Sequence, residues 1–258
     1  MSDAINQLTP HERQAVAHVE QNKAAYRERA TREAAQQSAA AEAAHVDQLR
    51  NVVHREVGNI PGADAAPSEL RRLSDTVKSM VSEADRTFRD AAKARGDDTL
   101  PVETREARAQ DIATVGQAKL DQLRDQALTE VEVAKAKLSV KALPKPTGEA
   151  ETFARQDAEV TLTSADSTLE GLEKLAQDPD PNVRALAAGS WGRRRLEAAG
   201  VRNADSVHQA VVTQALQHTA TNGTGPRQRA AEAALKLTAK PAHAGVQYAS
   251  FRLGALRS

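Results

Sequence analysis

The sequence predicts an all-α fold, in which long helices come first and a small bundle of shorter helices follows. The 258 residues include 51 Ala but only three Phe, two Tyr and one Trp. Alanine is the best intrinsic helix former, and large side chains are too scarce to fill the thick core of a sheet sandwich. A stretch of 47 residues without glycine or proline, residues 11–57, gives the same indication. We therefore expect almost no β-strand.

The first element, residues 1–57, is expected to be one long, extended helix. No glycine or proline interrupts the chain between Pro10 and Gly58, a length of about 72 Å at about 1.5 Å per residue. Larger apolar residues lie near both ends, but from Arg27 to Ala44 the only apolar residue type is alanine. Such a helix is either an exposed spacer or one strand of an alanine-lined bundle whose other members come from elsewhere.

The sequence predicts an antiparallel coiled-coil hairpin at residues 68–143. Its first helix begins at Ser68 and ends near Arg95, and its second runs from about Pro101 to Leu143. The first helix carries apolar residues at alternating spacings of three and four, the pattern of a coiled-coil seam: Leu70, Leu73, Val77, Met80, Ala84, Phe88 and Ala91. Prolines and a glycine then predict a linker at residues 144–151.

Residues 152–258 are expected to form a basic domain of shorter helices. The predicted spans are 150–177 with a break near 163–166, then 181–199, 203–220, 226–239 and 243–255. The segment Leu169–Trp191 resembles one HEAT repeat, since an Asp-Pro turn joins an apolar helix to an alanine-rich one. A fainter copy around Pro226 follows 45 residues after Pro181, within the period of HEAT units. The resemblance implies a HEAT-like helical domain and a surface for binding proteins rather than a catalytic site.

Opposite charges separate the two ends of the chain, although its net charge is zero. Residues 1–180 carry 24 Lys and Arg against 32 Asp and Glu, whereas residues 181–258 carry 11 against three. The candidate partner-binding patch consists of Arg184, Arg193, Arg194, Arg195, Arg202, Arg227, Arg229 and Lys236. We expect a protein partner with an acidic surface, or other copies of this chain. Nucleic acid is an alternative through backbone contacts only, because no aromatic residues alternate with the arginines to stack on bases.

We expect no catalytic residues, no metal site and no cofactor. The chain contains no cysteine, its seven histidines lack the spacing of a metal site, and no phosphate-binding or hydrolase motif occurs. Asp178 and Asp180 are interpreted as helix caps, and Trp191 as packing between helices. The polar N-terminal sequence and the absence of a long apolar segment predict a protein that is neither secreted by a signal peptide nor membrane-spanning.

In architecture and composition the chain resembles phage scaffolding and minor virion proteins, in which a coiled-coil body precedes a basic helical end. The resemblance implies a non-enzymatic structural or assembly protein of a virion, located in the virion or the host cytoplasm and part of an oligomer. The alternative is a bacterial cytoplasmic HEAT-like binding module for a protein or a nucleic-acid backbone. In either case we expect that deletion of residues 181–258 abolishes partner binding and leaves the helical front half folded.

Overall fold

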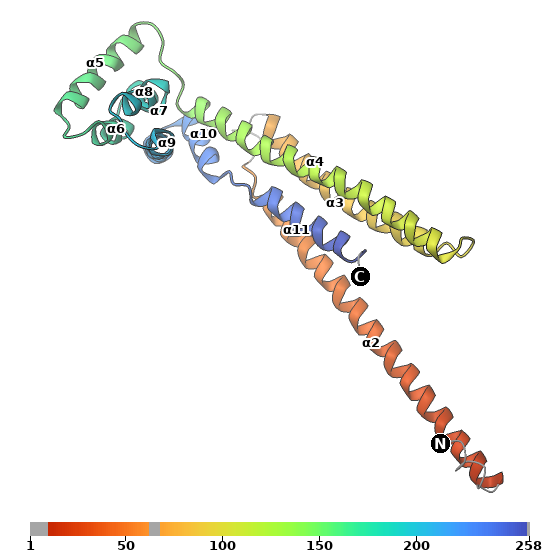
Figure 1. Cartoon of the computed structure of the whole chain (residues 1–258). Coiled ribbons are helices and arrows are strands. Elements are labelled where there is room, and N and C mark those ends of the chain that lie inside the picture. Colours follow the sequence, from red (N-terminus) through yellow and green to blue (C-terminus); the bar gives the residue numbers. More distant parts are fainter. Residues whose placement is uncertain (1–9, 62–67, 257–258) are drawn as a thin grey trace. The chain divides into compact units, whose positions relative to one another are not determined.

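A computed structural model describes residues 10–61 and 68–256 and confirms the all-α prediction, since this part of the chain contains helices and no strand. Its helices are α2 (Pro10–Gly58), α3 (Ser68–Arg95), α4 (Val102–Ala142), α5 (Glu149–Ser164), α6 (Thr168–Ala176), α7 (Pro181–Ala188), α8 (Ser190–Ala198), α9 (Ala204–Asn222), α10 (Gly225–Lys236) and α11 (Lys240–Gly254) (Figure 1). Within the described residues, none of these helices is long and apolar enough to cross a membrane.

The chain divides into two compact units, Met1–Asn51 and Val52–Ser258. The described part of the first unit is the body of α2, where every side chain from Lys23 to His45 is exposed. The alanines of this run do not form one stripe, because Ala30 and Ala39 lie nine residues apart and therefore on opposite sides of the helix. This part of α2 has no buried face of its own.

Helices α3 and α4 form an antiparallel hairpin in the second unit. Three pairs fix its direction: Thr76 with Gln126 at 3.2 Å, Glu83 with Lys119 at 3.1 Å, and Arg95 with Glu106 at 3.1 Å. As the residue number rises in α3, it falls by nearly the same amount in α4. The seam predicted from the sequence is buried between Leu70 and Ala91, except that Phe88 is half-buried.

The last two helices complete the core of this hairpin: α11 packs on α3 and α4, and α10 packs on α4 and α9. Gly245 lets the backbone of α11 approach α3 closely. A Cβ atom added at Gly245 would lie 3.2 Å from the sulfur of Met80 and 3.4 Å from a methyl group of Val77. The sequence predicted a hairpin at 68–143 and a separate domain at 152–258. In the structure, α10 and α11 belong to the second of these ranges but pack on the hairpin. Alanines spaced along α10 make this helix thin enough to pack between α4 and α9. Because alanine is common on exposed and buried faces alike, the sequence gives little indication of this packing.

Helices α5 to α9 form a small bundle around a second cluster of buried side chains. This cluster consists of Ala154, Ala158, Leu172, Leu175, Ala176, Val183, Leu186, Ala187, Leu196, Val211 and Ala215. The predicted helix break near 163–166 is confirmed, because α5 ends at Ser164 and α6 begins at Thr168.

The predicted single helix at 181–199 is wrong, because the chain is extended at Gly189 (φ −91°, ψ −173°) and divides into α7 and α8. Gly192 of α8 lies so close to the carbonyl group of Ala187 that a Cβ atom there would overlap it. The break thus depends on two glycines, which the sequence analysis included in one helix.

The HEAT-like description is not confirmed. The helix before the first predicted repeat turn, α6, has nine residues, whereas its counterpart α9 has 19. Helix α8 also lies between the two predicted copies. The two segments are therefore built differently, although both pair a helix with an alanine-rich successor.

Candidate functional site

The eight basic residues predicted to bind a partner fall into three groups in the structure. The first group is Arg184, which is only 5% exposed. Its guanidinium group donates hydrogen bonds to the carbonyl oxygens of Asp178 and Pro179, the latter at 3.0 Å. Burial lowers the pKa of Arg184, while Asp178 and Asp180 oppose that shift. Arg184 therefore holds the turn between α6 and α7 and offers no surface to a partner.

Of the two aspartates predicted to cap helices, Asp180 caps α7, whereas Asp178 stabilises the turn before it. Asp180 Oδ1 accepts a hydrogen bond of 2.8 Å from the backbone N–H of Asn182 in the first turn of α7. Asp178 Oδ1 accepts one of 2.7 Å from the N–H of Asp180. Both carboxylates are thus used by the backbone, which is the ordinary role of aspartate before a helix.

The second group, Arg193 and Arg195, is paired with carboxylates inside the bundle. Arg193 Nε lies 3.0 Å from Glu197 Oε1 and 2.9 Å from Asp205 Oδ1. Arg195 forms an ion pair with Glu159 of α5, and its guanidinium carbon lies 5.2 Å from the centre of the Trp191 ring. Part of the basic excess of the C-terminal segment therefore neutralises acidic residues of the same chain.

The third group is exposed and has no ion pair with a carboxylate in the part of the chain that the structure describes: Arg194, Arg202, Arg227, Arg229 and Lys236. These side chains lie on or next to α8 and α10, two helices separated by the whole of α9. Because Arg184 is buried and two of the other arginines are paired, the eight predicted residues do not all belong to one exposed, unpaired patch.

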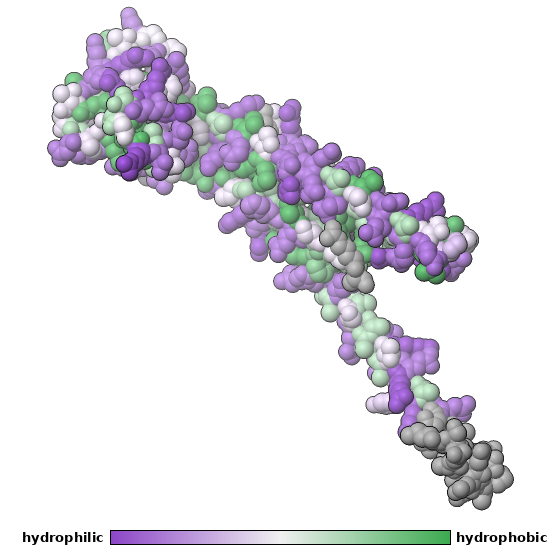
Figure 2. Space-filling view, in the orientation of Figure 1, coloured by the Kyte–Doolittle hydropathy of each residue, from purple (hydrophilic) through white to green (hydrophobic). Residues whose placement is uncertain are grey.

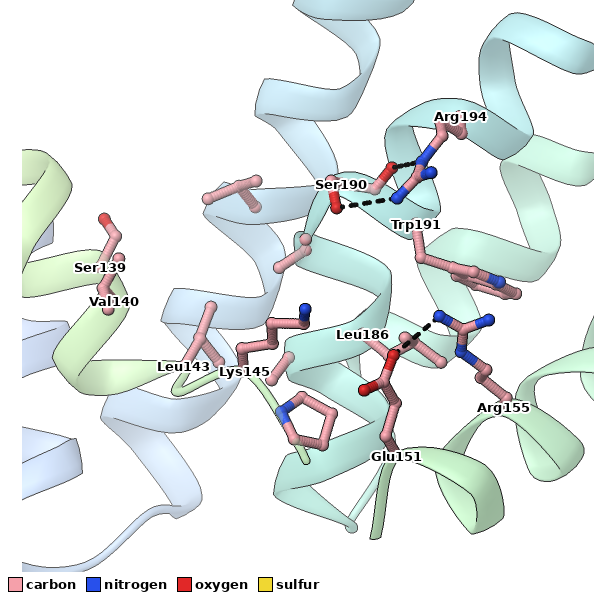
Figure 3. A pocket seen from close by; sticks show the side chains of 15 residues that line it. Ser139, Val140, Leu143, Lys145, Glu151, Arg155, Leu186, Ser190, Trp191 and Arg194 are labelled. Carbon is pink, nitrogen blue, oxygen red and sulfur yellow. Dashed lines mark hydrogen bonds and ion pairs between the residues drawn. The ribbon is translucent and has the colours of Figure 1, made fainter. Parts of the chain in front are cut away.

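A cavity of about 290 Å³ lies where the end of α4 and the linker meet the bundle. Its lining comes from α4, the linker, α5, α7, α8 and α9, and among the eight predicted residues it includes only Arg194. The larger apolar side chains in the lining are Val140, Leu143, Pro146, Leu186, Trp191 and Val212. Figure 3 shows these surroundings, and Figure 2 shows that the visible face of the molecule is otherwise mostly hydrophilic with small hydrophobic patches.

Four charged side chains line this cavity: Lys145, Glu151, Arg155 and Arg194. Glu151 Oε1 accepts a 2.7 Å hydrogen bond from Arg155, so these two charges compensate each other. Arg194 folds back on Ser190, with its Nε 3.2 Å from the backbone oxygen of Ser190 (Figure 3). Lys145 is exposed and has no ion pair within the described residues. The cavity therefore has a positive excess of two charges beside an apolar wall.

The sequence did not predict Lys145, Glu151 and Arg155 as site residues. The two prolines that flank Lys145 indicated a linker, and the approach of this linker to α7 and α8 depends on packing that no local pattern records. Trp191 was interpreted as a packing residue, and in the structure it is half-buried, both packing on the bundle core and lining the cavity.

His218 of α9 lies near the Arg184 turn, and its pKa is shifted. Desolvation lowers the pKa of His218 below its ordinary value of 6.5, the positive charge of Arg184 lowers it further, and Asp178 opposes the shift. Its Nδ1 atom is buried without a hydrogen-bond partner. The folded protein therefore favours the neutral form of the His218 imidazole over the charged form.

The described part of the chain contains no group of three or more His, Asp or Glu side chains placed to hold a metal ion. The lining of the cavity can instead provide charge complementarity and apolar contact, which are the properties of a binding site. Comparison of this chain with models of protein families, with curated proteins and with solved structures finds no match.

Proposed function

We propose that this chain is a non-enzymatic structural or assembly protein, of the kind that phage virions contain, located in the virion or the host cytoplasm. In this proposal, copies of the chain associate through α2, and the basic helical end binds an acidic partner subunit. The observation that carries the proposal is the run from Lys23 to His45, in which every side chain is exposed.

A helix gains most of its stability in proteins from packing of one face against other elements. No side chain of the run from Lys23 to His45 is buried, although the run spans about 34 Å at about 1.5 Å per residue. Tyr26, which is 76% exposed, adds a large apolar surface at one end of the run. A helical partner that covers this run supplies the missing contact, and the small alanine side chains allow the partner to approach closely.

A second candidate function is a bacterial cytoplasmic binding module that recognises a nucleic-acid backbone or a protein. The exposed cations without an ion pair in the described chain favour it, among them Arg202, Arg227 and Arg229. Phosphate contacts by such residues would make the affinity depend strongly on salt.

Retention of duplex DNA on a filter distinguishes the two functions. The assembly proposal predicts weak retention at about 150 mM salt that does not depend on α2. Tight retention that weakens steeply with salt would favour the binding module. In a plot of the logarithm of the affinity against the logarithm of the salt concentration, the slope should be about −0.9 for each phosphate that the protein contacts. Replacement of Arg227 and Arg229 by Gln would then reduce both the affinity and this slope.

A further inference from the structure

We propose that the cavity between α4 and the bundle binds an acidic peptide segment of a partner protein, which inserts one apolar side chain beside Trp191. The inference rests on the proposed function, because it provides the site for the acidic partner of that function. It also identifies the residues that would bind this partner, most of which are not among the eight basic residues predicted from the sequence.

The apolar part of the cavity is suited to one or two side chains. Leu143, Pro146, Leu186 and the Trp191 ring line a volume of about 290 Å³, at the lower end of the range of about 300–1,000 Å³ for ligand sites. Val140, which is 67% exposed, extends the apolar lining outward along α4. A leucine or phenylalanine side chain placed here would remove apolar surface from water on both partners.

The charged side chains of the cavity determine which peptide residues fit on either side of the inserted apolar side chain, here called the anchor. The Glu151–Arg155 ion pair is satisfied within α5, whereas Lys145 and Arg194 have no carboxylate partner in the described chain. The bond of Arg194 to the oxygen atoms of Ser190 fixes its position and leaves guanidinium donors available for a ligand. Carboxylates on both sides of an apolar anchor match these two cations.

A nucleic acid fits this cavity less well than a peptide. Non-specific binding of single strands uses several aromatic platforms along a basic groove, and this cavity offers a single aromatic ring, Trp191. Arg195 already approaches that ring at 5.2 Å. Double-stranded DNA is too wide to enter and would meet only the cations at the rim.

Trp191 provides a direct measurement, because it is the only tryptophan of the chain. The full-length protein is titrated with the acetylated hexapeptide Glu-Asp-Leu-Phe-Asp-Glu amide, while Trp191 emission is excited at a wavelength that tryptophan alone absorbs. We expect a saturable change in emission. The same peptide with Ala-Ala in place of Leu-Phe should bind about tenfold more weakly or less, because it lacks the anchor.

Three variants test the named residues. Lys145→Glu and Arg194→Glu should each weaken binding of the Leu-Phe peptide about tenfold, and Arg202→Glu is the matched control, with the same charge reversal outside the cavity. Ala188→Phe fills the cavity without a change of charge and should also prevent binding. Circular dichroism establishes that each variant keeps the helical content of the wild type.

Four results would overturn the inference: no change in Trp191 emission, equal affinity for both peptides, equal weakening by Arg202→Glu, or full displacement of the peptide by an equimolar single-stranded oligonucleotide. Failure of the proposed function is distinguishable, because it would appear as a chain that does not self-associate. Peptide binding by a monomeric chain would support the site and contradict the assembly through α2.

Discussion

The hydroxyl group of Tyr248 donates a 2.6 Å hydrogen bond to Oδ1 of Asp85, which lies 163 residues earlier in the chain. Arg252 Nε reaches the same carboxylate oxygen at 3.0 Å, and its guanidinium carbon lies 3.9 Å from the centre of the Phe88 ring. Tyr248 itself is completely buried. These contacts fasten α11 to α3 and make the C-terminal helix part of the core of the hairpin.

Replacement of Tyr248 by Phe should lower the free energy of unfolding by about 1.5–3 kcal/mol, because it removes a hydrogen bond to a charged acceptor and keeps the ring. Urea unfolding followed by circular dichroism measures this change. The matched control is Tyr26→Phe, which alters the other, exposed tyrosine and should change stability by less than about 0.5 kcal/mol. Equal effects of the two substitutions would contradict the role of the Tyr248–Asp85 bond.

Gly116→Ala should lower the free energy of unfolding by about 1–3 kcal/mol, the usual cost of overpacking. A Cβ atom at Gly116 would overlap the side chain of Thr87, which is 3% exposed at the contact of α3 with α4. Adding Thr87→Ala should recover part of the loss, so the two substitutions should be clearly non-additive in a double-mutant cycle.

Gly254→Ala is the control for this experiment, since nothing lies within 4 Å of the Cβ position there. It should leave the unfolding midpoint nearly unchanged. A Gly116→Ala protein as stable as the wild type would show that α3 and α4 are not packed as closely as described.

The stability of the protein should fall as the pH decreases below about 6.5, in part because of His218. Its pKa is lowered in the folded protein, so the unfolded chain binds this proton more readily. Stability is therefore lost from the ordinary pKa of 6.5 downward and ceases to fall below the lowered pKa. Urea midpoints of wild type and His218→Gln, measured from pH 7.5 to 5.0, should diverge in this interval, with the wild type losing more. Parallel curves would contradict this assignment.

A chain that ends at residue 180 should be less stable than the sequence analysis expected. It lacks α10 and α11, and removal of α11 uncovers Val77 and Met80 on the hairpin. Residues 1–180 should therefore have a lower melting midpoint than the full chain and should bind a hydrophobic dye. A melting transition identical to that of the full chain would instead restore the expectation of an independent front half.

The sequence predicted the long elements better than their arrangement. Helices α3 and α4 begin and end within a few residues of the expected positions, and α2 ends within one residue of its expected end, because uninterrupted runs and turn residues such as Gly58 and Gly96 mark them. Residues 1–9 of the expected first helix lie outside the described residues. The separation of α7 from α8 was missed because it depends on the contact of Gly192 with the carbonyl group of Ala187, which only the tertiary structure reveals.

Two features of the site were equally inaccessible from local patterns. The arginine run 193–195 predicted one basic surface, but adjacent helical residues point in different directions, and two of the three meet carboxylates of the same chain. The cavity beside Trp191 depends on how the linker returns to the bundle. No periodicity or motif indicates this return.

Sedimentation equilibrium of the full-length protein, at several micromolar concentrations and about 150 mM salt, tests the proposed assembly function most directly. The proposal predicts a mass that is a multiple of 27.6 kDa and that decreases when Tyr26 and Ala34, on the exposed run of α2, are both replaced by Glu. A mass of one chain at every concentration for the wild type would contradict the association of copies through α2.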